Sequence, residues 1–271
     1  MDELKVVRAG FAPVKGTRHL AYDAVRLDEQ GPVGDRGYAL VDLRGEGVTT
    51  TPATSPGPAR VLKTVQNPTL IAVRAELVGR RLDVVLPDGE GASAEPVATG
   101  EMVTSDYWGR QRPLELVDGP HAELFSRWLG RPVRLARAGR GDVVYAGAVT
   151  LIGTASLCDL AEHVGDPGLA RIEQAARFRP TLVVETEEPF VEETWLGRVL
   201  RLGPAADAPT VRVGVPIPRC AVIDLDPVSG GRGSRLLKTL ASYRPLNTAG
   251  EPAFGVFAEV VSPGVARVEG P

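Results

Sequence analysis

The feature that most constrains this chain is how often its backbone is interrupted. Its 271 residues include 31 glycines and 23 prolines, about a fifth of the chain, where about 12% is usual. Because proline breaks helices and glycine favours turns, this density disfavours long helices. Between the breakers lie short β-branched runs, among them Val25–Leu27, Tyr38–Val41, Thr181–Val184 and Val256–Val261. The pattern predicts many short strands joined by turns.

Helical periodicity is confined to four short segments. These are His121–Leu129, Ser156–Val164, Leu169–Ala176 and Ser234–Leu240. In the second of them, Ser156 is a residue type that caps helix N-termini. Because helices are too rare to alternate with strands, we expect a mainly β (α+β) protein, mostly antiparallel, with barrels or curled sheets.

Two strand-rich halves flank the first helical segment. Turn-forming residues occur before it, at Val117–Pro120, and after it, at Gly130–Pro132. We therefore predict a β-barrel-like domain over residues 1–125 and a second β-barrel domain over residues 126–271. Thr49–Ala59 holds three prolines, which cannot donate to a sheet ladder, so this segment is expected to be a loop.

The overall charge excludes some partners. With 31 Lys and Arg against 34 Asp and Glu, the formal net charge is −3, which argues against a general nucleic-acid binder. No apolar run approaches the roughly 18 residues of a membrane span. The N-terminal sequence MDELKVVRAG is charged and lacks the apolar stretch of a signal peptide, so we expect a cytoplasmic protein.

Familiar catalytic signatures are missing from the sequence. It holds two cysteines, Cys158 and Cys220, which excludes a disulfide scaffold and an iron–sulfur cluster held by four thiolates. It contains neither a nucleotide P-loop nor a GxSxG elbow. Its three histidines, His19, His121 and His163, lack the spacing of a zinc-binding helix. Metal-dependent hydrolysis and triad chemistry are therefore disfavoured.

The most distinctive segment is Pro216–Cys220, with the sequence PIPRC. Its two prolines stiffen the backbone, and Arg219 favours the thiolate form of the neighbouring Cys220. A thiolate on a stiff support suits a soft metal or a nucleophile. The alternative is that Cys220 begins a strand, Cys220–Leu225, as a small core residue. Cys158 lies inside a helical segment and has no such setting.

Several further motifs, taken in order with this one, resemble those of the MOSC family preceded by its N-terminal β-barrel domain. The closest likeness is to the amidoxime-reducing molybdenum enzymes. The resemblance covers nearly the whole chain and is carried by Pro13–Gly16, Gly34–Asp42, Thr154–Leu157, Arg177–Pro180, Pro189–Trp195, Arg219–Cys220, Asp226–Gly230, Tyr243–Arg244 and Phe254–Gly255. Within it, Asp226–Gly230 is expected to form a turn.

The resemblance implies a molybdenum cofactor, an anionic pterin with a dithiolene and a phosphate, held between the two domains. Cys220 would be the catalytic cysteine and metal ligand, because soft sulfur suits molybdenum. An anion needs fixed positive charges and hydrogen-bond donors. The implied cofactor-binding residues are Lys15, Gly16, Arg36, Thr154, Ser156, Arg179, Thr181, Arg219, Cys220 and Phe257. No pyridoxal phosphate is expected.

Three positions depart from the pattern of the reductases. Thr181 stands where they tend to have Asn, Pro218 where Ser often precedes the cysteine, and Phe257 where an aromatic residue with a hydroxyl is common. Each change alters a donor near the expected cofactor.

The leading hypothesis is an oxidoreductase that reduces N-hydroxylated or other N-oxygenated small molecules. Because two cysteines cannot hold a plant-type cluster, electrons would come from a separate redox partner, a reductase or a ferredoxin-like protein. Neither nucleic acid nor a membrane is an expected partner.

Two alternatives stay open. The chain could be a cofactor carrier or sulfur-transfer module in which Cys220 holds a persulfide, since MOSC-like domains also end molybdenum cofactor sulfurases. It could also be a β-barrel module that binds a different anion and no metal.

Overall fold

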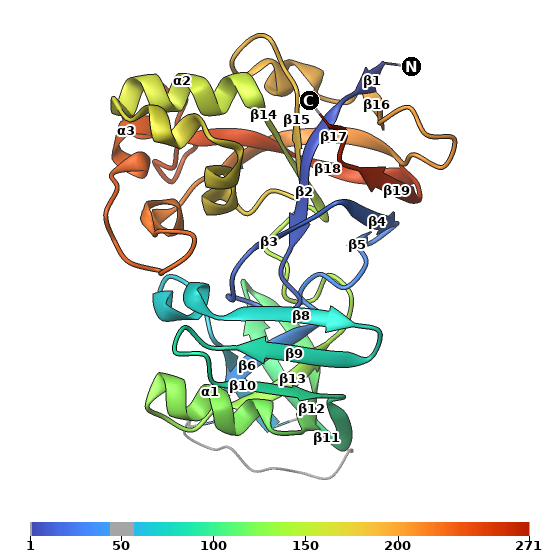
Figure 1. The fold of residues 1–271 in the computed structure, drawn as a ribbon, viewed down its shortest axis with the longest axis vertical. Coiled ribbons are helices and arrows are strands. Elements are labelled where there is room, and N and C mark those ends of the chain that lie inside the picture. Colours follow the sequence, from blue (N-terminus) through green and yellow to red (C-terminus); the bar gives the residue numbers. More distant parts are fainter. Residues whose placement is uncertain (1, 44–56, 271) are drawn as a thin grey trace.

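The computed structural model describes residues 2–43 and 57–270, and within them the chain is mainly β, as predicted (Figure 1). These residues form nineteen strands, three α-helices and five short 3₁₀-helices. Most of the predicted Thr49–Ala59 loop lies outside the described residues. Its last part does not form a loop, because Gly57–Val61 is a strand, β7.

The lower half in Figure 1 is built around a closed five-stranded barrel. In pairing order its strands are β11 (Val97–Tyr107), β12 (Arg110–Asp118), β13 (Arg134–Ala138), β6 (Tyr38–Asp42) and β7 (Gly57–Val61). A three-stranded sheet, β8 (Arg74–Val78), β9 (Arg81–Val85) and β10 (Gly91–Ala94), accompanies it with α1 (His121–Leu129) and η1 (Pro68–Ala72). Leu40, Leu82, Phe125 and Leu135 fill the core between these elements.

The upper half is an eight-stranded sheet. In pairing order its strands are β1 (Glu3–Leu4), β16 (Val199–Leu202), β17 (Thr210–Pro218), β18 (Ala253–Ser262), β14 (Val149–Gly153), β15 (Leu182–Val184), β2 (Val6–Phe11) and β3 (Leu20–Tyr22). The helical elements are α2 (Thr154–Val164), α3 (Leu236–Tyr243), η2 (Pro167–Ala170), η3 (Ile172–Phe178), η4 (Val191–Trp195) and η5 (Ala221–Asp224). A small sheet of β19 (Gly264–Arg267), β4 (Ala24–Asp28) and β5 (Gly31–Pro32) lies beside it.

Each half combines strands that are far apart in the sequence. The N-terminal strands β1 and β2 pair with β16 and β15, and β13 closes the barrel between β12 and β6. The chain therefore crosses between the halves more than once. The division into residues 1–125 and 126–271 stays a prediction.

One connection differs from the expectation that no strand–helix–strand unit occurs. β14 leads into α2 and then, after two 3₁₀-helices, into β15, which pairs with β14 in parallel. A parallel pair needs such a crossover, and here α2 packs the apolar side chains of Leu157 and Leu160 into a core. Most of the other strand pairs are antiparallel, as predicted.

The predicted helices are confirmed in place, with corrections at their ends. His121–Leu129 agrees with α1. α2 begins at Thr154, and its N-cap is Gly153 rather than Ser156. Leu169–Ala176 is divided between η2 and η3, and the last helix runs from Leu236 to Tyr243 instead of ending at Leu240.

Cys220–Leu225 is not a strand. Cys220 follows β17 and caps η5, whose residues are Ala221–Asp224. Across the residues described, no helix is both long enough and apolar enough to cross a bilayer.

Candidate functional site

Two loops beside the barrel strand β6, in the lower half, bring Lys15 and Arg36 together. Val14 bridges Tyr38 in parallel, and the Lys15 amide donates to the Tyr38 carbonyl over 2.8 Å. The Arg36 amide donates to the Ala12 carbonyl, also over 2.8 Å. Gly16 has a φ of 91°, a conformation that favours glycine, and it turns the chain directly after Lys15.

The upper half contributes Arg179, Arg219 and Cys220. Arg179 ends η3 with a φ of 53°, and Arg219 follows β17. The buried Arg219 side chain ties these segments together, because Nη1 donates to the Phe178 carbonyl over 2.9 Å and Nε to the Phe254 carbonyl over 2.8 Å. The Cys220 side chain is exposed beside it. The core-residue alternative for Cys220 is therefore wrong.

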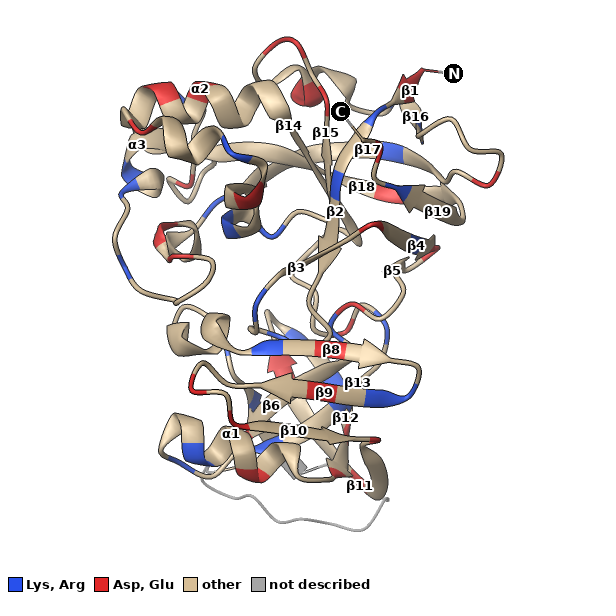
Figure 2. Cartoon of the chain, in the orientation of Figure 1, with Lys and Arg blue, Asp and Glu red and all other residues tan. Residues whose placement is uncertain are grey.

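Electrostatic coupling joins the two sets of residues at the junction of the halves, where Figure 2 shows Lys and Arg on segments of both. Burial, with the positive charges of Arg36 and Arg179, lowers the pKa of Lys15 to about 7, while Asp35 and Cys220 oppose the shift. Burial and the Arg36 charge lower the pKa of Arg179 to about 10. Lys15 thus lies within electrostatic range of Arg36, Arg179 and the Cys220 sulfur, and Arg219 within range of the same sulfur.

Several donors in this cluster lack an acceptor. Asp35 accepts from Arg36 Nε over 2.7 Å. Among the described residues, no carboxylate is within ion-pair distance of Lys15 or Arg179. The buried Nη2 of Arg219 has no hydrogen-bond partner there either, and burial lowers the pKa of Arg219 to about 9. Buried charge without a counter-ion is costly, so the cluster is suited to an anionic ligand.

Backbone strain concentrates around the same place. In the described ranges, the non-glycine residues with positive φ are Arg36, Trp108, Arg179 and Phe190, at 46°, 56°, 53° and 60°. This conformation costs an L-residue about 1–2 kcal/mol. Two of the four are the cluster arginines, and strain of this kind is typical of functional sites.

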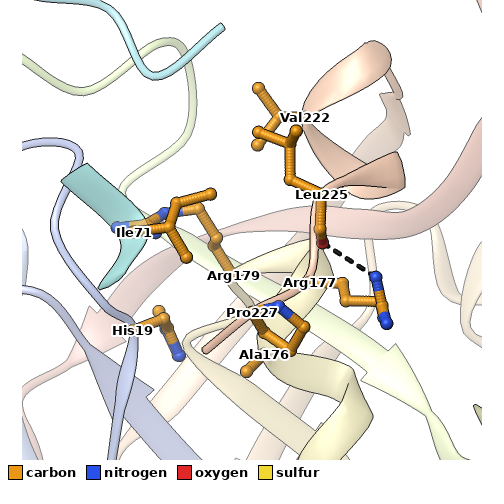
Figure 3. A pocket seen from close by; sticks show the side chains of 8 residues that line it. All are labelled: His19, Ile71, Ala176, Arg177, Arg179, Val222, Leu225 and Pro227. Carbon is orange, nitrogen blue, oxygen red and sulfur yellow. Dashed lines mark hydrogen bonds between the residues drawn. The ribbon is translucent and has the colours of Figure 1, made fainter. Parts of the chain in front are cut away.

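A small pocket opens beside Arg179, between the halves (Figure 3). The pocket is small and partly open to solvent. Its polar side chains are His19, Arg177 and Arg179, and its apolar wall consists of Ile71, Ala176, Val222, Leu225 and Pro227. Arg177 is held in place because Nη1 donates to the Leu225 carbonyl over 2.8 Å. The pocket combines a cationic side with an apolar one.

His19 and Tyr107 belong to this region but were not predicted. Nδ1 of the buried His19 lies 3.1 Å from Arg8 Nη2 and must accept, because a guanidinium only donates. Burial and the Arg8 charge hold the pKa of His19 well below its usual range, so the ring is neutral. Tyr107 is buried under Lys15, whose Nζ lies 5.3 Å from the ring centroid. His19 stands four residues after Lys15, whereas Tyr107 carries no local signal.

The start of α2 holds the predicted Thr154 and Ser156, whose hydroxyls bond within the protein. Ser156 Oγ donates to the buried Glu192 carboxylate, 2.8 Å from Oε1, and the Gly153 amide donates to the same oxygen. Thr154 Oγ1 donates to the Thr186 carbonyl over 3.2 Å. These hydroxyls are committed to side chains and backbone of their own half.

Thr181 and Phe257 also have contacts within the upper sheet. The Thr181 hydroxyl accepts from the Thr150 amide over 3.1 Å. The half-buried Phe257 packs so closely against Gly147 that a Cβ there would lie 2.8 Å from the Phe257 Cβ. Both residues brace β14 and its neighbours.

The predicted turn at Asp226–Gly230 is confirmed. Asp226 Oδ1 accepts from the Ser229 amide over 2.8 Å, and Gly230 has a φ of 72°. A side chain at Gly230 would collide with the Pro68 carbonyl of η1. The turn therefore packs against η1 of the lower half, beside the pocket.

Comparison with known proteins gives a family match and relatives that align with most of the chain. The family model described as MOSC domain matches residues 136–271, half of the chain. Molybdenum cofactor sulfurases from Anopheles gambiae and from Oryza sativa subsp. japonica are each 25% identical, over 94% and 90% of this chain. The chain spans about a third of their length, 34% and 31%.

Among solved structures, the YuaD protein of Bacillus subtilis aligns over 98% of this chain and 91% of its own, with a TM-score of 0.41 and 12% identity. On the family match, this chain belongs to the MOSC domain family.

Proposed function

We propose that this protein binds a molybdenum cofactor at the junction of its halves and reduces N-hydroxylated or other N-oxygenated small molecules. The observation that carries the proposal is a cluster of cations near the exposed Cys220: Lys15 and Arg219 lie within electrostatic range of Cys220, and Arg36 and Arg179 within range of Lys15. Family membership and similarity to molybdenum cofactor sulfurases support the choice of cofactor.

The residues present fit this cofactor. Its phosphate needs charge-assisted donors, and the buried Arg219 Nη2 is a donor without a partner among the described residues. The Cys220 thiolate would be the protein ligand of the metal, since thiolates select soft metals. When bound, the cofactor supplies two-electron redox chemistry. Lys15, Arg36 and Arg179 would hold its anionic groups, with the arginines able to bind in a bidentate manner.

The pocket beside Arg179 would receive the substrate. Its apolar wall, with Ile71, Val222 and Leu225, would lie against the substrate next to the bond to be broken. Arg177 and Arg179 would orient the oxygen-bearing end. In the net reaction the N–O bond of a hydroxylamine takes up two electrons and two protons, and an amine and water leave. We propose a separate electron-transfer protein as the reductant, because a four-thiolate cluster needs more cysteines than this chain has.

A second candidate is sulfur transfer. It is favoured by the 25% identity to molybdenum cofactor sulfurases over more than nine-tenths of the chain. The Cys220 thiolate would then attack the outer sulfur of a persulfide on a donor protein, which forms the Cys220 persulfide and releases the donor's thiol. The exposed position of the Cys220 side chain suits such transfer.

The test is to purify the protein from a host that makes the cofactor and to measure molybdenum, pterin and persulfide sulfur. Reduction of benzamidoxime by reduced methyl viologen is assayed in parallel. We expect Cys220→Ala to lose molybdenum and reduction, while Cys158→Ala, which removes the other exposed cysteine, keeps both.

Full molybdenum and activity in Cys220→Ala would refute the ligand assignment. Molybdenum without reduction, together with persulfide that disappears in Cys220→Ala, would favour the sulfur-transfer candidate instead.

A further inference from the structure

Trp108 occupies a turn position that local physics does not favour. It and Gly109 form the two-residue loop between β11 and β12, whose last pair is Tyr107 with Arg110. Their φ values are 56° and 74°, the signature of a type I′ turn, where Asn, Asp and Gly are preferred at the first position. A tryptophan there costs about 1–2 kcal/mol.

Burial does not offset this cost. Trp108 is 55% exposed and its neighbour Tyr145 is 45% exposed. The two rings meet edge to face with centroids 4.9 Å apart, and Lys63 Nζ lies 4.2 Å from the Trp108 centroid. Arg110 Nη2 donates to the Tyr145 carbonyl over 3.3 Å, which links the two loops. Two large aromatic rings are thus held in a defined arrangement at the surface.

The pair lies next to the cationic cluster. Trp108 directly follows Tyr107 at the end of β11, and the Tyr107 ring lies under Lys15. Arg36 and Arg179 are close enough to act on the pKa of Tyr107. A ligand whose polar end reaches these cations can therefore extend over the aromatic pair.

We propose that Trp108 and Tyr145 form a stacking subsite for a planar aromatic group of the substrate. Stacking on an aromatic side chain contributes about 1–3 kcal/mol per ring, enough to offset the strained turn. The half-exposed position of the pair points to the substrate, because the cations that would hold the cofactor are partly or fully buried. The assignment of this ligand as the substrate rests on the proposed function, whereas the affinity for aromatic rings does not.

The test uses Trp108→Asn in the cofactor-loaded protein. Asn suits the first position of this turn, so the variant should fold and melt at or above the temperature of the parent. KM is compared for benzamidoxime and for acetamidoxime, which has no ring. We expect KM for benzamidoxime to rise about tenfold, near 1.4 kcal/mol, with acetamidoxime and molybdenum content unchanged. Tyr145→Ala should shift the ratio in the same direction, and Tyr145→Phe should not.

A binding measurement tests the stacking subsite without requiring catalytic turnover. Quenching of tryptophan fluorescence by benzamidoxime is expected in the parent and in Trp128→Phe, and its loss is expected in Trp108→Asn. Quenching that follows this pattern without any reduction would refute the proposed function and leave the subsite standing. The inference is overturned if Trp108→Asn keeps the preference for the aryl substrate, or if it loses molybdenum, which would mean that the pair holds the cofactor.

Discussion

Two regions of this molecule have the composition of an anion site, but only one of them has cationic donors that no carboxylate of the protein pairs. At the start of α2, Glu192 accepts from Gly153 and Ser156, and Thr186 bonds Thr154. At the junction of the halves, Lys15 and Arg179 have no carboxylate within ion-pair distance in the described ranges. The first region is complete as it stands, and the second is not.

The difference teaches that donor types alone do not define a ligand site. A helix N-terminus favours any negative charge, and at α2 the buried Glu192 supplies it. Its pKa is raised by burial, although the donors of Gly153 and Ser156 oppose the shift. At the junction, Asp35 is the carboxylate beside Arg36, and several cations exceed its single charge. Unpaired charge, rather than donor count, marks the proposed ligand site.

The largest expected effect tests whether Glu192 is the acceptor that pairs the donors at the start of α2. Glu192→Ala removes the acceptor for the buried Ser156 hydroxyl and the Gly153 amide. Leaving two buried donors unpaired should lower the free energy of unfolding by roughly 2–4 kcal/mol. Urea denaturation measures it, with Glu188→Ala on the same connection as control. A loss below about 0.5 kcal/mol would show that the carboxylate is not the cap.

The next effect tests whether the unpaired cation of Arg179 at the junction serves the cofactor rather than the fold. Arg179→Ala removes a cation that the fold does not pair, so stability should change little and cofactor retention should fall. A charge-assisted hydrogen bond contributes about 1.5–3 kcal/mol, which corresponds to a 10- to 150-fold weaker hold. Pterin content after dialysis measures it, and Arg171→Ala, an exposed arginine ahead of the same helix, is the control. Equal pterin loss in both variants would remove Arg179 from the cluster.

The pH dependence of anion binding gives a smaller effect. The pKa of Lys15 is lowered to about 7, so in cofactor-free protein its positive charge is present below pH 7 and lost above it. Affinity for sulfate, whose own charge is constant, should fall up to about tenfold between pH 6 and pH 8. Titration calorimetry measures it. Lys15→Arg, which stays charged, should flatten the profile, and an unchanged slope in that variant would assign the titration to another group.

The fold could be predicted where local sequence decides it. α1 agrees with its predicted bounds because its apolar spacing and its flanking Pro120 and Gly130 are local signals. The residue type of Ser156 predicts it as the N-cap of α2, but the helix begins at Thr154, and the Ser156 hydroxyl donates to Glu192, which lies 36 residues further along the chain. Such long-range partners leave no trace in local periodicity.

The site divides in the same way. Motifs singled out Lys15, Arg36, Arg179 and Arg219. In the structure, electrostatic interaction joins the first three to one another, and Lys15 and Arg219 each to Cys220. Tyr107 was missed, because only barrel closure brings the end of β11 under Lys15. Thr154 and Ser156 were included by motif, although their hydroxyls face acceptors from another segment. A sequence shows which donors exist, and pairing in the fold decides which of them are free.

The smallest effect sharpens the comparison at a single hydroxyl. Thr154 Oγ1 donates to the Thr186 carbonyl and accepts from the Thr186 amide over 3.0 Å. Thr154→Val keeps the shape and removes both bonds, so unfolding free energy should fall by about 1 kcal/mol. Because this hydroxyl is already paired, molybdenum and pterin content should equal those of the parent. A variant as stable as the parent but poor in pterin would reverse the roles assigned to the two regions, because the hydroxyl would then serve the cofactor rather than the connection to Thr186.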